Sequence, residues 1–240
     1  KTSGSEPVQM TAPGESYDKP LFSPDGKTLA AHHARTSTGN KLYSLTRLAR
    51  FDWPSGKMTR LGDEFDRSAG DYAFTSDSSA IVFAAEDGGF TQLFRMPVSG
   101  GAPKRLLEVQ AGNYGSPMYA GQTLLAMYGS STQPTEIARV DPARGTHTLL
   151  TSFNRERLAR LELPAPEHFW FTAKNGKRIH SVIVFPPQLD KSRKYPLIVN
   201  PHGGPNSMSS DAFSVRWNYH LLTSPGYVLI ATNYTGSTGF

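Results

Sequence analysis

The stretch Tyr195-Pro196-Leu197-Ile198-Val199-Asn200-Pro201-His202-Gly203-Gly204-Pro205 decides the fold of the C-terminal part of this chain. Residues 197–199 are a continuous apolar run, which is typical of a strand buried on both faces. Asn200 and Pro201 end that strand, and His202 opens a turn with two glycines. Because glycine has no Cβ, the chain can bend sharply there and its N–H groups can approach a bound oxygen atom closely. The pattern predicts a buried strand that leads into such a turn.

The residues before this stretch predict a β-hairpin. Residues 169–172 and 179–185 are apolar strands, joined by a polar turn over residues 174–177. The Asn175-Gly176 pair in that turn favours the positive φ angles of a type I′ turn.

The residues after this stretch predict a helix and a second strand. Asp211 is a candidate helix cap, and apolar residues at intervals of four form one face of the helix: Phe213, Trp217 and Leu221. Pro225-Gly226 ends the helix, and residues 227–232 form the strand. Because a strand–helix–strand crossover joins parallel strands, we expect residues 197–199 and 227–232 to pair in parallel.

The first 150 residues repeat a different pattern. Three times, an aromatic-containing strand, a tight polar turn and a second apolar strand predict a hairpin, with turns near residues 23–27, 75–79 and 120–122. A second hairpin follows in each unit, and the first unit is longer by the polar insert at residues 36–40. Four short strands in a unit of about 40 to 50 residues are typical of one propeller blade.

The predicted fold is therefore a partial all-β propeller of about three blades, followed by the first part of an α/β-hydrolase domain. We place the propeller at residues 1–150, a charged and proline-rich linker at 151–165, and the hydrolase part at 166–240. Three blades are too few to close a ring, so further blades are expected in the parent protein.

Composition narrows the class of protein. The chain has 25 Lys and Arg residues against 20 Asp and Glu residues. Because the basic residues are scattered and form no stripe, no nucleic-acid partner is expected. No segment is long and apolar enough for a membrane helix, and Lys1–Ser5 shows no targeting signal. The absence of cysteine excludes disulfides, thiolate metal sites and a cysteine nucleophile. His32-His33 alternate between the faces of an expected surface strand, so no metal or cofactor is predicted.

Several short motifs occur together in one order and spacing, at residues 194–199, 202–205, 226–228 and 236–239. With the partial propeller and the Asn-Gly hairpin, they resemble the prolyl oligopeptidase family of serine peptidases over nearly the whole chain. Residues 216–218 and 233–240 look most like members that release dipeptides, whereas many other members carry arginine where Thr235 stands.

This resemblance implies part of a catalytic site. The backbone N–H of Gly204, or of Gly203, would be one donor of an oxyanion hole, with His202 shaping the loop. The nucleophile should lie in a Gly-x-Ser-x-Gly turn, which the chain does not contain. Ser237 has only a superficial likeness to that turn and comes one strand–helix unit too early. We therefore expect no Ser-Asp-His triad in this chain, and no activity from the chain alone.

The resemblance also implies that the substrates are oligopeptides, from which a serine peptidase would release dipeptides or other short N-terminal units. The propeller would restrict access to the active site. The free α-ammonium group needs a carboxylate, which Glu86 or Asp87 could supply; a solvated turn is the alternative. An acylaminoacyl peptidase-like hydrolase and a non-catalytic propeller binding module are the other two functions. The resemblance favours a periplasmic or secreted protein, leaves the cytoplasm open, and is compatible with a homo-oligomer.

Overall fold

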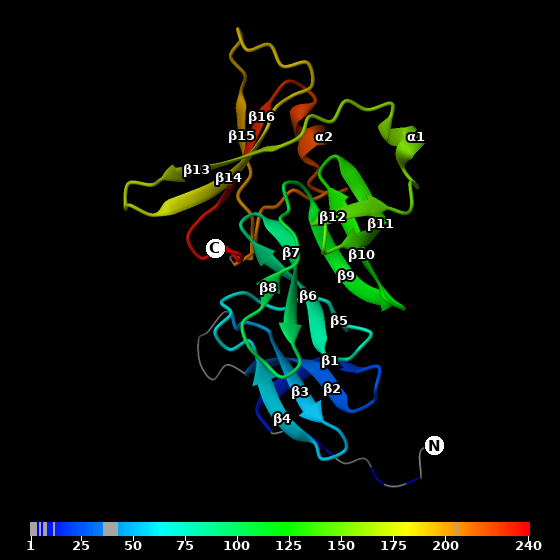
Figure 1. Ribbon diagram of the computed structural model, residues 1–240. Coiled ribbons are helices and arrows are strands. Elements are labelled where there is room, and N and C mark those ends of the chain that lie inside the picture. Colours follow the sequence, from blue (N-terminus) through cyan, green and yellow to red (C-terminus); the bar gives the residue numbers. More distant parts are fainter. Residues whose placement is uncertain (1–3, 5, 7–8, 12, 36–42, 205) are drawn as a thin grey trace.

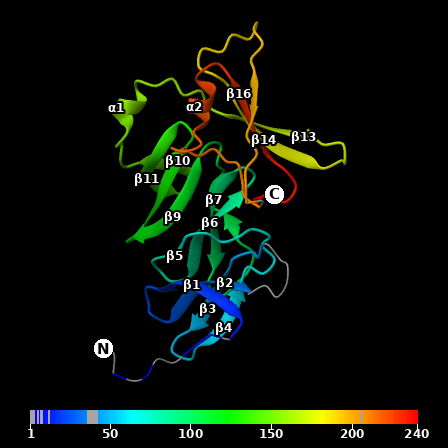
Figure 2. The same ribbon diagram turned by 180° about the vertical axis from the view of Figure 1, so that it is seen from behind.

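The structure is a computed structural model that describes residues 4, 6, 9–11, 13–35, 43–204 and 206–240. These residues form sixteen strands, arranged as four four-stranded sheets, and two short helices. Figure 1 shows the first sheet at one end of the molecule and the fourth at the other, with the second and third between them, and Figure 2 shows the same order from behind. The insert at residues 36–40 and Pro205 lie outside the described residues.

The first three sheets are consecutive antiparallel meanders. The first contains β1 (Glu15–Phe22), β2 (Thr28–Arg35), β3 (Arg47–Asp52) and β4 (Lys57–Leu61). The second contains β5 (Tyr72–Phe74), β6 (Ala80–Asp87), β7 (Phe90–Pro97) and β8 (Lys104–Arg105). The third contains β9 (Asn113–Ala120), β10 (Thr123–Ser130), β11 (Gln133–Asp141) and β12 (Thr146–Leu149). Each repeat therefore forms the two hairpins that its sequence predicts.

The two-residue period of β6 joins these three sheets into one body. Ile81 and Phe83 point toward the first sheet and share its apolar cluster, whereas Val82 and Ala84 point toward the third. Because all four side chains are buried, β6 is covered on both faces. Its sequence is accordingly a continuous apolar run.

The first strands of the three sheets converge on one another. The Tyr72 hydroxyl of β5 donates to the Lys19 carbonyl of β1 at 2.5 Å. Asp71, just before β5, pairs with the Lys19 ammonium group and accepts from the Ser116 hydroxyl of β9 at 2.9 Å. The bond from Lys19 lowers the pKa of Asp71 below its usual value. Strands from three separate repeats are thus held around one point.

The paired histidines of β2 are not on a surface, so that expectation was wrong. His32 and His33 are 6% and 2% exposed, because β2 is an inner strand of its sheet and both faces are covered. The His32 ring contacts the Asp18 carboxylate and the Gly70 carbonyl, each at 2.8 Å. His33 lies against Glu15 on the other face. The two rings therefore make separate polar contacts on opposite faces of the first sheet.

The fourth sheet has the order β13 (Glu167–Thr172), β14 (Arg178–Val184), β16 (Val228–Asn233), β15 (Leu197–Val199). The β13–β14 hairpin and the parallel pairing of β15 with β16 are as predicted. The hairpin turn is not of type I′, because Gly176 has a positive φ and Asn175 does not. Ala173 instead bonds to both Gly176 and Lys177, which suits a type I turn followed by a left-handed glycine.

The opening apolar run is buried on one face only, which corrects the expectation for residues 197–199. Among the described residues, β15 is one of the two edge strands of the fourth sheet. Ile198 packs on the apolar cluster around Val182, whereas Leu197 and Val199 point away from it and are 58% and 62% exposed.

The two helices of the described residues are α1 (Arg155–Leu158), between β12 and β13, and α2 (Tyr219–Thr223), before β16. The helix expected after Asp211 begins only at Tyr219, and its cap is Asn218, whose side chain accepts from the Leu221 N–H at 2.9 Å. Trp217 and Leu221 are 57% and 68% exposed, so the expected apolar face is not packed. Asp211 is buried elsewhere, in a contact described below.

Candidate oxyanion loop and adjoining cavity

The candidate site begins where β15 ends. The Asn200 N–H still bonds to the Ile230 carbonyl of β16 at 2.8 Å, so the strand fixes the start of the loop. His202, Gly203 and Gly204 follow, and both glycines are exposed. Within the part of the chain that the structure describes, neither glycine N–H donates a hydrogen bond. Two backbone donors are therefore available to a bound oxygen atom.

The His202 side chain holds this loop against the segment after β16. Its Nε2 atom lies 2.7 Å from the Ser237 hydroxyl oxygen, and its ring stacks on Tyr234 with centroids 4.3 Å apart. The Tyr234 hydroxyl donates to the His202 carbonyl at 2.8 Å. Three contacts thus tie one loop residue to the end of the next parallel strand.

The His202–Ser237 pair has the wrong hydrogen-bond direction for a nucleophile and its base. The Ser237 hydroxyl donates its proton to the Tyr234 carbonyl at 2.7 Å, so that proton is not directed at His202. Ser237 is only 4% exposed, and no carboxylate among the described residues contacts the imidazole. The geometry makes both residues parts of the loop scaffold.

A cavity of about 560 Å³ lies beside this scaffold. Its walls come from all three meander sheets and from residues 236–240. Glu86, near the end of β6, is half-buried in the wall, and its carboxylate has no ion pair or hydrogen bond with any described residue. The Glu86 carboxylate is therefore unpaired in the cavity lining, and the segment that carries Ser237 lies next to its turn, because the Gly88 N–H donates to the Gly239 carbonyl at 3.0 Å.

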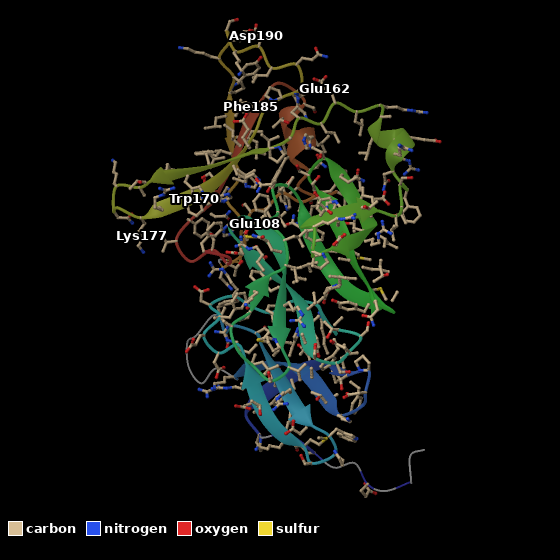
Figure 3. The ribbon with its side chains drawn as sticks, in the orientation of Figure 1. Glu108, Glu162, Trp170, Lys177, Phe185 and Asp190 are labelled. Atoms are coloured by element: carbon tan, nitrogen blue, oxygen red, sulfur yellow. The ribbon has the colours of Figure 1, made fainter. Side chains whose placement is uncertain are left out.

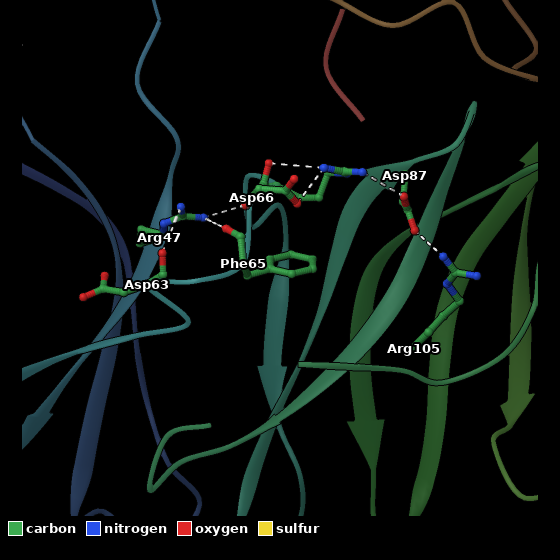
Figure 4. A network of polar contacts seen from close by, with 7 residues as sticks. Arg47, Asp63, Phe65, Asp66, Asp87 and Arg105 are labelled. Atoms are coloured by element: carbon green, nitrogen blue, oxygen red, sulfur yellow. Dashed lines mark hydrogen bonds and ion pairs between the residues drawn. The ribbon is translucent and has the colours of Figure 1, made fainter. Parts of the chain in front are cut away.

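Asp87 differs from its neighbour because its carboxylate is already paired. Asp87 Oδ1 lies 3.4 Å from Arg67, and its Oδ2 pairs with Arg105, as Figure 4 shows. Arg67 also contacts Asp66 at 2.6 Å. The charge of Asp87 is thus used to hold two arginines, which leaves Glu86 as the carboxylate open to a ligand.

A second contact at the site involves residues that local sequence patterns did not single out for it. The Asp211 carboxylate is 2% exposed and accepts from the N–H groups of Gly112 at 2.6 Å and Ser131 at 2.8 Å, both in loops of the third sheet. The Asn113 amide donates to the Asp211 carbonyl. The partners are 80 to 99 positions away in the sequence, so no spacing rule could have found them.

A third contact joins a buried histidine, His180, and a half-buried one, His168, where the fourth sheet meets the β6–β7 turn. Asn233 donates to His180 Nδ1 at 2.9 Å, and His180 Nε2 lies 3.1 Å from His168 Nδ1. Burial first, and then the neighbouring His168, lower the pKa of His180 to about 4. Phe90 of β7 stacks on His168 with centroids 4.5 Å apart. The second sheet thus docks on a neutral imidazole pair.

Two classes of site find no support in the described residues. None of their histidine, aspartate and glutamate side chains gather in groups of three that could hold a metal ion. Nor do they form a helix with the length and apolar character needed to cross a membrane.

Comparison with known proteins adds sequence relatives and structural neighbours. No protein-family model matches the chain. It is 34% identical to a probable dipeptidyl-peptidase 5 of Emericella nidulans, over 99% of this chain and 34% of that protein. It is 32% identical to dipeptidyl-peptidase 5 of Porphyromonas gingivalis, over 93% of this chain and 32% of that protein. The chain is a homologue of these prolyl oligopeptidase-family proteins.

Solved structures of the prolyl oligopeptidase family share its fold. Acylaminoacyl peptidase of Pyrococcus horikoshii superimposes with a TM-score of 0.72 at 20% identity, over 90% of this chain and 32% of that one. A puromycin hydrolase superimposes with a TM-score of 0.63 at 19% identity, over 97% of this chain and 35% of that one. The chain spans about a third of the length of the dipeptidyl-peptidase 5 relatives that it matches.

Proposed function

We propose that this chain belongs to a serine peptidase that releases dipeptides from the free N-terminus of oligopeptides. The observation that carries the proposal is the pairing of two free backbone donors, in residues 203–204, with a cavity that presents the unpaired carboxylate of Glu86. Such an enzyme needs donors for a tetrahedral oxyanion and an anionic partner for the substrate ammonium group. The names of its relatives support the same reaction class.

The fold that we propose for the parent enzyme is a propeller followed by an α/β-hydrolase domain. The three meander sheets, with their converging first strands, support propeller blades within residues 1–150. The parallel β15–β16 pair supports a hydrolase sheet within residues 166–240. Residues 151–165 would link the two parts. Together with further blades, the propeller would admit peptides to the active site and exclude folded proteins.

In the proposed mechanism, the N–H of Gly204 or Gly203 stabilises the oxyanion of the tetrahedral intermediate. One such donor lowers the barrier by roughly 3 to 4 kcal/mol. His202 holds the loop through Ser237 and Tyr234, and does not act as the base. The nucleophile, its histidine and its acid are supplied by residues outside this chain, in a protein that works in the periplasm or is secreted.

Glu86 is assigned to the substrate ammonium group, with Asp87 held in its arginine pairs. A charge-assisted hydrogen bond of this kind contributes about 1.5 to 3 kcal/mol. Glu86→Gln in the full-length protein should therefore raise KM for a free-amine dipeptidyl chromogenic substrate about 10- to 100-fold. Hydrolysis of the N-acetylated substrate should not change, because that substrate carries no ammonium group.

The matched control is Glu156→Gln, an exposed glutamate of α1 that lies outside the cavity lining. It should leave both substrates unaffected. Cleavage of N-acetylated substrates in preference to free-amine ones would instead identify an acylaminoacyl peptidase-like enzyme, a candidate favoured by the structural neighbour from Pyrococcus horikoshii. Full-length protein without hydrolysis of either substrate would refute the peptidase proposal.

A further inference from the structure

One cross-strand register pair and two hydrogen bonds connect Glu86 to the segment that follows the oxyanion loop. In the β6–β7 ladder, Glu86 lies directly opposite Thr91. The Thr91 N–H donates to the Asn113 side-chain oxygen at 2.6 Å, and the Asn113 amide donates in turn to the Asp211 carbonyl. Glu86 on the second sheet is thereby linked through the third sheet to the segment that follows the oxyanion loop.

Asp211 fixes that segment more firmly than a single bond would. Its two carboxylate oxygens accept from separate loops of the third sheet, through the N–H groups of Gly112 and Ser131. A side chain at Gly112 would place its Cβ atom 2.6 Å from the Gly129 carbonyl oxygen, so glycine is required for this approach. The buried carboxylate is satisfied by donors that only the third sheet supplies.

The same segment is also fixed to the fourth sheet. Asn233 of β16 accepts from the Ser209 N–H at 2.7 Å and donates to the Ser209 carbonyl at 2.9 Å. The Thr238 N–H donates to the Ser207 carbonyl at 3.2 Å. Motion of Asp211 relative to the third sheet would therefore be transmitted along residues 207–211 to the oxyanion loop.

We infer that the Thr91–Asn113–Asp211 link sets the distance between Glu86 and the oxyanion loop. This distance places the scissile peptide bond after the second residue from the substrate N-terminus. This inference rests on the proposed function. An extended peptide advances about 3.5 Å per residue, so one residue more or less moves the scissile carbonyl by that distance. A site that selects dipeptides must hold its ammonium partner and its oxyanion donors to well within that length.

The test is a length panel on the full-length protein. Free-amine chromogenic substrates with one, two or three residues before the leaving group are compared by kcat/KM. Asn113→Ala removes both bonds of the link, and Asp211→Asn replaces one of the two acceptors by a donor. Each variant should lower kcat/KM for the two-residue substrate about tenfold, with the one- and three-residue substrates changing less. The preference for two residues should fall at least about fivefold.

Asp190→Asn is the matched control, because Asp190 is exposed, bonds only within its own loop and lies at the far end of the fourth sheet (Figure 3). It should leave the length preference unchanged. Thermal unfolding and near-ultraviolet circular dichroism establish that each variant is folded, and Asn113→Ala, at a half-buried position, carries the test if Asp211→Asn does not fold.

The outcomes separate the inference from the proposed function. Equal losses of kcat/KM on all three substrates, or an unchanged length preference, would overturn the inference. The proposed function would still hold as long as the wild type releases dipeptides. A wild type that releases no dipeptides would overturn both.

Discussion

The sharpest test of the oxyanion loop is Gly204→Ala. Gly204 has a φ of +124°, a backbone conformation that L-residues rarely adopt. A Cβ atom there would also lie 3.1 Å from the Asn206 nitrogen and 3.2 Å from the Ser207 nitrogen, both of which are backbone atoms that cannot rotate away. Strain of this kind costs on the order of 1 to 3 kcal/mol.

The loop can relieve that strain by rotating the peptide group between Gly203 and Gly204, which turns the Gly204 N–H away from the oxyanion. Loss of one oxyanion donor lowers kcat by roughly 10²- to 10³-fold. We therefore expect Gly204→Ala in the full-length protein to lower kcat by about 10²-fold with a small change in KM. Gly203→Ala should cost far less, because Gly203 has no left-handed φ and its Cβ would meet open space.

The assay is steady-state hydrolysis of a dipeptidyl chromogenic substrate, together with thermal unfolding. Gly226→Ala controls for backbone strain, because Gly226 has a φ of +99°, open space around its Cβ, and a position after α2, outside the proposed site. That variant should lose stability and keep its kcat. A folded Gly204→Ala enzyme with kcat within about threefold of wild type would refute the assignment of this loop.

Three further predictions follow from the contacts around the site. Ser237→Ala should lower kcat less than tenfold, because the hydroxyl holds the loop; a loss of about 10³-fold or more would instead make Ser237 the nucleophile. Asp87→Asn should lower the free energy of unfolding by about 1 to 2 kcal/mol in denaturant titrations, since Arg67 and Arg105 lose part of their shared partner. His180 is neutral in the fold with a pKa of about 4, whereas in the unfolded chain it takes up a proton near 6.5. Stability should therefore fall by up to about 3 kcal/mol as the pH drops from 7 to 4 and level off below that, and His180→Gln should flatten the profile.

Local patterns were sufficient for elements that local contacts stabilise. The meander hairpins follow from polar turns between apolar strands, and residues 23–27 show the reason: Ser23 and Asp25 bond to the backbone of the same turn. The parallel pairing of β15 and β16 follows from the length of the connection between them. These features depend on neighbours in the sequence, so the sequence could predict them.

Asp211 shows why the helix prediction failed. An aspartate before spaced apolar residues is a good local sign of a helix N-terminus. In the structure, the N–H groups of Gly112 and Ser131 take both carboxylate oxygens, and Asn218 caps a shorter helix instead. Tertiary contacts outweighed the local preference. The spacing between Asn218 and Leu221 is itself a capping signal that the sequence does carry.

Glu86 and Asp87 show the same limit at the candidate site. The sequence presents two adjacent carboxylates at one turn and cannot distinguish their roles. Only the fold brings Arg67 and Arg105 to Asp87, from opposite sides of β6 in the sequence, and leaves Glu86 facing the cavity. The site is therefore specified by charge pairing between distant segments rather than by a motif.

The turn glycines acquire a second role once the parts are assembled. In the sequence, Gly88-Gly89 is an ordinary hairpin turn. In the structure, a Cβ atom on Gly89 would lie 2.5 Å from the His180 ring, so the turn can approach the buried imidazoles only as glycine. Gly112 has the same role beside Asp211. Gly89 lies where the second sheet meets the β13–β14 hairpin, and Gly112 lies where the third sheet meets the segment that follows the oxyanion loop. A larger residue at either glycine would separate Glu86 from the loop without touching either one, so the geometry of the proposed site depends on these positions as much as on the residues that face the substrate.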